Sequence, residues 1–415
     1  MKKKDFERII LTDEYISWLE EFSNKYNCFD TMYFVHYYKN VLPERDIKYI
    51  FLLEDFYQEL EIYFKQSSRG LLKNNNQVFE LENNGECYSC KKVEPTNEET
   101  LDYSKFKKKY LKNMNLNFDF LEERVFDSLE KSDLEKIKYV LSNINGNTLI
   151  SGVGGSSVVA EYLKRVLEEK NKILCERIQP RDFLYKNLAN YSNVIATSYG
   201  GKNYGVDISF QNDLNKYLFS HSEREGITPI KYDFSFPNER SFISLAATLI
   251  PMSILLYYYS NSKQLVKDIL SKTKELTNIK AKDIYEVFSG YESSTATRYL
   301  ESTMTESGIA IPIIHDKYDY CHGRSTTTYN NSENGIIYFD NNKKLDNIIL
   351  EEFKNYKNEV IVFKSKYEDS IIDDYYLTYS SMLLTKTLAS NKNKDLSDVD
   401  YAPIVKKLYL YKGDM

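Results

Sequence analysis

The chain has 415 residues and a formal net charge of −6. At about 150 residues per domain, this length predicts two or three domains. The acidic balance argues against general nucleic-acid binding, and no apolar run reaches the roughly 18 residues of a membrane-spanning helix, so we expect neither nucleic acid nor membrane as a partner.

Five cysteines, an odd number, fit a reducing compartment better than a disulfide framework. The N-terminal sequence MKKKDFER lacks the apolar stretch and the small-residue cleavage site of a signal peptide, which also predicts a cytoplasmic protein. Cys87 and Cys90 form a single CxxC, whereas a structural zinc site needs a second pair of ligands. Cys28 and His36 could complete such a site only through a long loop, so we expect no metal.

Residues 1–115 predict a mainly helical N-terminal domain of unassigned role. Apolar and aromatic residues recur at helical spacing in three segments, Asp13–Tyr26, Asp30–Asn40 and Arg45–Gln66. A hairpin follows, with strands at Gln77–Leu81 and Cys87–Val93 around an Asn-Gly turn. Aromatic stripes of this kind are typical of a core or an interface rather than of a cofactor site.

Residues 116–280 predict a first α/β domain. After a helical stretch that includes Phe126–Leu141, short apolar runs alternate with amphipathic segments. Short strands separated by helices are typical of a parallel sheet covered by helices on both faces. The predicted strands are Asn147–Val153, Lys172–Ile178, Asn193–Thr197 and Thr228–Tyr232, and the predicted helices include Val158–Glu169, Glu239–Tyr259 and Gln264–Leu276.

The pattern restarts in residues 281–390, which predict a second domain of the same kind, and residues 391–415 follow as a tail. This restart is a weak internal repeat with a period of roughly 130 residues. The fold class is therefore α/β, with two three-layer α/β/α units on flavodoxin-like parallel sheets and the added helical domain. The predicted strands here are Asp283–Phe288, Ile309–Ile314, Gly335–Phe339 and Glu359–Phe363, and the last predicted helix is Ile371–Leu388.

Two loops rich in glycine and serine follow predicted strands of the first unit. They are Gly152–Ser157 and Ser198–Asn203, and each leads into a helix. Ligands of open α/β sheets bind at the carboxyl ends of the strands, and backbone N–H groups at a helix N-terminus favour an anion such as phosphate. Neither loop has the spacing of a nucleoside-triphosphate loop, and the first lacks the last glycine of a dinucleotide fingerprint, so a nicotinamide enzyme is a poor second choice.

The second unit contains a carboxylate and an imidazole near the ends of its predicted elements. Glu306 ends the helix that follows the first strand, and His322 lies in the turn beyond the strand Ile309–Ile314. A carboxylate and a histidine on neighbouring elements suit general acid–base chemistry on a small substrate. His315, directly after the same strand, is interpreted as structural.

These motifs resemble the sugar isomerase (SIS) domain family in its tandem form, over roughly residues 120–415. The closest pattern is the isomerase half of glucosamine-6-phosphate synthase and related phosphosugar isomerases and deglycases. Gly152–Ser156 is similar to the family's G-x-G-x-S loop, and Ser198–Asn203 to its S-x-S-G-E-T loop, which holds the sugar phosphate. Glu306, His322 and Asp398–Asp400 are similar to the catalytic glutamate, the histidine of an H-G-P turn and a D-V-D segment of the tail.

The resemblance implies a role for each matching residue and implies no cofactor. Glu306 would move a proton between C1 and C2 of an open-chain sugar, and His322 would open the sugar ring. Lys407, with Lys406 as the one-residue alternative, would anchor the open chain or form an imine. The residues that would hold the phosphate are Gly154, Ser156, Ser157, Ser198, Tyr199, Gly201, Lys202, Asn203 and Arg324.

The chain also departs from the family pattern. Gly200 and Asn203 replace a serine and a threonine, Lys202 replaces an acidic residue, and Arg324 replaces a proline. We predict an enzyme that binds a sugar phosphate or amino-sugar phosphate and catalyses aldose–ketose isomerisation or a linked deamination or deglycation. The alternative is a catalytically silent sugar-phosphate sensor. Because the family's sites are often completed across a dimer, the resemblance implies a homodimer with shared active sites.

Overall fold

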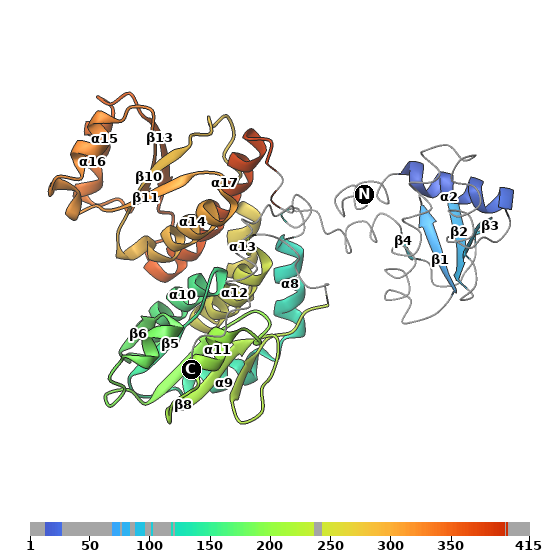
Figure 1. Ribbon diagram of the computed structural model, residues 1–415, viewed down its shortest axis with the longest axis horizontal. Helices are drawn as coiled ribbons and strands as arrows, with labels where there is room; N and C mark the ends of the chain where they lie inside the picture. Colours follow the sequence, from blue (N-terminus) through green and yellow to red (C-terminus); the bar gives the residue numbers. More distant parts are fainter. Residues whose placement is uncertain are drawn as a thin grey trace. The chain divides into compact units, whose positions relative to one another are not determined.

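The computed structural model describes residues 13–26, 69–74, 77–83, 88–95, 101–102, 118, 121–235, 243–394 and 396 (Figure 1). The chain divides into two units, Met1–Leu116 and Asn117–Met415. No helix in these ranges is long and apolar enough to cross a membrane. Of the two CxxC cysteines, only Cys90 lies in these ranges, and its thiol is free and buried. No group of His, Cys, Asp and Glu side chains in these ranges is arranged to hold a metal ion.

In the first unit, helix α2 (Asp13–Tyr26) confirms the first predicted helix. Strands β2 (Gln77–Asn83) and β3 (Tyr88–Val93) confirm the hairpin. Two strands that were not predicted, β1 (Arg69–Asn74) and β4 (Leu101–Asp102), extend it to a sheet of order β3-β2-β1-β4. Outside the described residues lie the other two predicted helices, Asp30–Asn40 and Arg45–Gln66.

The first sheet of the second unit has five parallel strands in the order β6-β5-β7-β8-β9. Every residue of β5 and β7 is buried, as expected for strands that helices cover on both faces. Strand β8 was not predicted, because its first half is polar and only its second half is buried. The strands are β5 (Thr148–Ser151), β6 (Cys175–Ile178), β7 (Asn193–Thr197), β8 (Asn215–Ser220) and β9 (Thr228–Lys231).

Helices flank this sheet largely where the amphipathic pattern predicted them. The predicted helix Glu239–Tyr259 is present as α12, but it begins later than predicted, at Ala246, since residues 243–245 are not helical. A short helix, α11, follows the second glycine loop. The helices are α8 (Leu121–Lys131), α9 (Leu134–Ser142), α10 (Gly155–Asn171), α11 (Tyr204–Ser209), α12 (Ala246–Ser260) and α13 (Lys263–Lys272).

The second sheet has four parallel strands in the order β11-β10-β12-β13. The first four strands of the first sheet lie in the same spatial order: the second strand along the chain is at the edge, and the first, third and fourth follow it across the sheet. This shared order supports the internal repeat. The elements are β10 (Ile284–Ser289), α14 (Ser294–Ser307), β11 (Ile311–Asp316), α15 (Ser325–Asn330), β12 (Gly335–Asp340), α16 (Lys344–Phe353), β13 (Glu359–Lys364) and α17 (Ser370–Asn391).

The two sheets share a layer of helices, and Figure 1 shows α10, α12, α14 and α17 between them. Helix α17 is buried on nearly all sides, as expected for a helix without a polar face. Arg165 of α10 forms an ion pair with Asp374 of α17, and both side chains are fully buried. Asp374 also accepts hydrogen bonds from the backbone N–H groups of Thr295 and Ala296, both at 3.1 Å. This network therefore joins α10, α14 and α17.

Candidate functional site

The first glycine loop connects β5 to the N-terminus of α10. Gly154 has φ +57° and ψ −134°, a conformation that favours glycine. Gly152 is in close contact with the helix, since a Cβ there would come 2.3 Å from Ser156 O. Thr197, the last residue of β7, donates its hydroxyl to Ser156 O at 2.6 Å. The loop is thus held at the carboxyl edge of the sheet by its neighbouring strand.

The two serines of this loop differ in their environment. Ser157 is buried and donates its hydroxyl to Gly154 O at 2.7 Å, so it stabilises the turn itself. Ser156 is half-buried, and its hydroxyl bonds to none of the described residues. Helix α10 begins here and is 17 residues long, so its dipole favours an anion at this end. Of the two hydroxyls, Ser156 is the one available to a ligand.

The second glycine loop follows β7 and is closed by internal hydrogen bonds. Ser198 Oγ accepts from the Gly201 backbone N–H at 3.1 Å and from Asn203 Nδ2 at 3.3 Å. Asn203 also caps α11, because its Oδ1 accepts from Val206 N at 3.0 Å. Gly201 has φ +64°, which the turn requires, and Lys202 is exposed. The loop therefore presents one cation and one hydroxyl proton that can still be donated.

An aromatic cluster that the sequence did not indicate supports this second loop. Tyr199 stacks on Phe234, with ring centroids 5.8 Å apart, and packs edge-on against His221 at 4.8 Å. Partial burial lowers the pKa of His221, which keeps the imidazole neutral near pH 7. Phe234 and His221 lie on separate loops after β9 and β8, so no local sequence pattern could have joined them to Tyr199.

The two loops lie side by side. Strands β5 and β7 are paired neighbours, so both loops leave the same edge of the sheet. A Cβ at Gly205, in the first turn of α11, would come 3.1 Å from Val153 Cγ2 in the first loop. The backbone amides of the first loop and the Ser198 hydroxyl of the second therefore lie at the same edge of the sheet.

Glu306 reaches this edge from the second sheet's first helix. It lies in the last turn of α14, and a Cβ at Gly154 would come 3.3 Å from Glu306 Oε1. The residue is exposed overall, yet the surrounding protein desolvates its carboxyl and raises its pKa above the usual value. The hydrogen bond from Ser302 Oγ, 3.4 Å from Oε1, opposes this shift but does not outweigh it. A carboxylate of raised pKa thus lies beside the first glycine loop.

His322 and Arg324 lie elsewhere. His322 is exposed in the turn after β11, and Arg324 donates from Nη1 to Ile314 O at 3.3 Å. Glu306 precedes the six-residue strand β11 and His322 follows it, so they lie at opposite ends of a strand that is roughly 17–20 Å long. No hydrogen bond joins the two among the described residues. Lys406 and Lys407 lie outside those residues.

His315 is buried in a polar network inside the second sheet. Its Nε2 lies 2.9 Å from Glu286 Oε2, which also accepts from Thr328 Oγ1, and Asn334 Nδ2 donates to Glu286 Oε1 at 2.9 Å. Burial alone would raise the pKa of Glu286, but the hydrogen bonds from its three partners outweigh it and hold the pKa below its usual value. With both side chains at most 2% exposed, this pair is shielded from solvent.

Comparison with known proteins supports the fold. No family model matches the chain, and neither does any curated protein sequence. The solved structures that are similar to it include three with the following names. They are the C-terminal domain of glucosamine-fructose-6-phosphate aminotransferase from Francisella tularensis (13% identity, TM-score 0.52, covering 68% of this chain and 96% of that one), tagatose-6-phosphate ketose/aldose isomerase from Escherichia coli (11%, 0.54, 69% and 96%) and glucosamine-6-phosphate deaminase from Thermotoga maritima (14%, 0.50, 66% and 96%).

At these identities the similarity shows the fold alone. Each of the three structures is covered almost completely by about two thirds of this chain. The predicted fold class, two α/β units of the sugar isomerase type with an added N-terminal region, is therefore confirmed.

Proposed function

We propose that this chain binds a sugar phosphate at the two glycine loops and moves a proton between C1 and C2 of its open form. The observation that carries the proposal is the position of Glu306, whose carboxyl lies beside Gly154 of the first loop. A general base must lie within hydrogen-bond reach of the proton that it takes. A ligand whose phosphate is held at the loops would have its reacting carbons near this carboxyl.

The chemistry follows from the raised pKa of Glu306. Its carboxylate removes the C2 proton of an aldose, the carbonyl oxygen takes up a proton, and a neutral enediol results. Return of the proton from Glu306 to C1, with loss of the C2 hydroxyl proton, completes the conversion to a ketose. A carboxyl whose pKa lies closer to neutrality is a stronger base in the first half and remains an acid in the second. Deamination or deglycation of an amino-sugar phosphate would use the same proton transfer.

The separation of Glu306 from His322 favours a shared site. Because β11 separates the two residues within one copy, a role for His322 beside Glu306 requires the His322 of a second copy of the chain. We therefore include a homodimer in the proposal, with His322 of one copy completing the site of the other. Lys407 in the tail is proposed to hold the open chain.

A sensor without turnover is the second candidate, and one observation favours it. Asn203 is occupied in capping α11 and Ser157 in bonding Gly154 O, so two of the predicted phosphate-binding side chains are already engaged. The loop retains Lys202 and the Ser198 hydroxyl for an anion. Such a site could still bind a sugar phosphate without positioning it for proton transfer.

Two measurements test the proposal. A thermal-shift screen of the full chain against hexose and hexosamine 6-phosphates should find a stabilising ligand, and no response to any would contradict both candidates. Deuterium exchange from solvent into C2 of that ligand then separates them. Exchange that is lost in Glu306→Gln supports the enzyme, whereas wild-type binding without exchange supports the sensor.

Mixing two inactive variants tests the shared site. Glu306→Gln and His322→Asn each remove one group, so each variant alone should be inactive. If the groups come from different copies, a mixed dimer contains one intact site and exchange returns on mixing. Exchange that stays absent after subunit mixing is verified would contradict the shared site but not the role of Glu306.

A further inference from the structure

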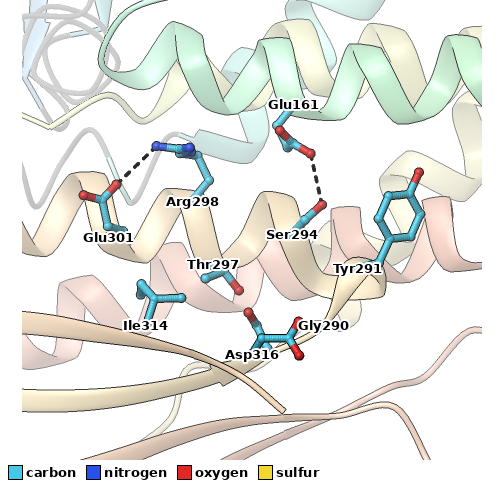
Figure 2. Close-up of a pocket in the computed structure, with 10 residues that line it drawn as sticks. Glu161, Gly290, Tyr291, Ser294, Thr297, Arg298, Glu301, Ile314 and Asp316 are labelled. Carbon is cyan, nitrogen blue, oxygen red and sulfur yellow. Dashed lines mark hydrogen bonds and ion pairs between the residues drawn. The ribbon is translucent and has the colours of Figure 1, made fainter. Parts of the chain in front are cut away.

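A cavity of about 610 Å³ lies beside α14 at the carboxyl ends of β10 and β11 (Figure 2). This volume is in the range of small-molecule sites. None of the described residues of the two glycine loops lines it, and neither does Glu306. Its polar side chains come from one face of α14, from α10 and from the strand ends, and they are Ser294, Thr297, Arg298, Glu301, Glu161, Ser289 and Asp316.

Most charges around the cavity are already paired. Arg298 Nη1 lies 3.6 Å from Glu301 Oε2. Arg177 Nε donates to Glu161 Oε2 at 3.0 Å, and Figure 2 shows the other oxygen of Glu161 facing Ser294 Oγ, at 3.4 Å. Both glutamates are therefore compensated by an arginine, and neither requires a cation from a ligand.

Asp316, unlike the two glutamates, is not paired with an arginine among the described residues. Its Oδ1 accepts from the backbone N–H groups of Tyr318 and Asp319, at 2.8 and 3.3 Å, but its Oδ2 has no partner among the described residues. The side chain is exposed and lines the cavity. The cavity therefore keeps one uncompensated negative charge, at the end of β11.

Ser289 is the second group that is available to a ligand. It is only 8% exposed, and its hydroxyl makes no hydrogen bond to any residue that the structure describes. Ser289 and Asp316 are directly paired in register across β10 and β11, so both side chains lie on the same side of the sheet. Because Ser289 lines the cavity and its hydroxyl has no partner among the described residues, that hydroxyl can donate and accept hydrogen bonds with a ligand. The two groups thus form one polar pair in the lining of the cavity.

We propose that this cavity binds a hydroxylated primary amine of the size of an unphosphorylated amino sugar. The ammonium would pair with Asp316 Oδ2, and a ligand hydroxyl would bond to Ser289. A phosphorylated compound is disfavoured, because the lining has three acidic side chains and one basic one. The inference goes beyond the proposed function, since it uses none of the residues of the phosphosugar site.

Titration calorimetry of the full chain with glucosamine, and with glucose as the neutral analogue, tests the inference at slightly acidic pH, where the amine is protonated. Glucosamine should bind, and glucose should bind about tenfold or more weakly, as expected for loss of a charge-assisted hydrogen bond. Absence of glucosamine binding, or equal binding of glucose, would overturn the inference.

Two variants locate the site. Asp316→Asn keeps the Oδ1 acceptor of the turn but removes the charge, so glucosamine affinity should fall about tenfold or more while the thermal midpoint stays unchanged. Asp319→Asn, an exposed neighbour that does not line the cavity, is the matched control. Glucosamine affinity that survives Asp316→Asn would overturn the inference. Glu306→Gln should leave this affinity unchanged, which keeps the outcome independent of the phosphosugar site.

Discussion

Glu306 and Gly154 lie close together between the two sheets of the second unit: a Cβ at Gly154 would come 3.3 Å from Glu306 Oε1. The glutamate ends α14 of the second sheet, and the glycine precedes α10 of the first. The Ser294 to Glu161 hydrogen bond near the other end of α14 shows that these two helices run antiparallel. Their packing therefore decides how far the carboxyl lies from the phosphate loop.

The Glu306→Gln variant should lose C2 proton exchange by about 10²- to 10⁴-fold, as expected when a general base is removed. Because burial raises the pKa of Glu306, the acid limb of the wild-type pH–rate profile should lie above pH 4.5. A raised carboxyl pKa means that ionisation costs stability at pH values above it, so the variant should be no less stable than the wild type at pH 7. Exposed Glu352→Gln on α16 is the control, and it should keep full exchange.

The Gly154→Ala variant should be less stable than the wild type by about 1–3 kcal/mol, since the backbone at φ +57° and ψ −134° favours glycine. The added methyl group would also push against Glu306, so the rate of C2 proton exchange should fall by more than the loss of folded protein explains. Gly200→Ala is the control, because a Cβ there meets nothing within 4 Å and its φ is not positive. Urea unfolding and the exchange assay give the two readouts. Equal stability of both variants would contradict the backbone argument.

Gly200→Ser should strengthen sugar-phosphate binding by about two- to tenfold, the effect of one added hydrogen bond. The position has room for the side chain, and it lies in the loop that presents the Ser198 hydroxyl and Lys202. Calorimetry with the ligand found in the thermal-shift screen measures the change. Gly200→Ala adds the same backbone restriction without the hydroxyl, so an equal gain in both variants would argue against a phosphate contact at this residue.

Arg165→Met should reduce the free energy of unfolding by about 3–5 kcal/mol, because it leaves the fully buried Asp374 without its cation. The exposed pair of Lys354 and Glu351, with side chains 68% and 72% exposed, gives the matched control. Lys354→Met should change stability by at most about 1 kcal/mol. Urea denaturation curves of both variants compare the two. A similar small effect in both would mean that the helix network tolerates loss of the ion pair.

Much of the fold could be predicted from the sequence, because strands and helices leave local patterns. The alternation of apolar runs and amphipathic segments indicated both parallel sheets, and the two glycine loops were placed correctly after β5 and β7. Strand β8 was missed because half of it is polar. The strands β1 and β4 were missed as well, since β4 has only two residues and leaves no periodic signal.

The chemical groups of the site, and the element that carries each of them, could be read from the residues, since capping, turn formation and strand ends depend on near neighbours. Which of these groups lie close together depends on the tertiary structure. It brings Glu306 to Gly154, 152 positions away in the numbering, and it separates Glu306 from His322, only 16 positions away, by the length of β11. These distances are set by the packing of helices between the two sheets, and the spacing of residues along the chain does not encode that packing.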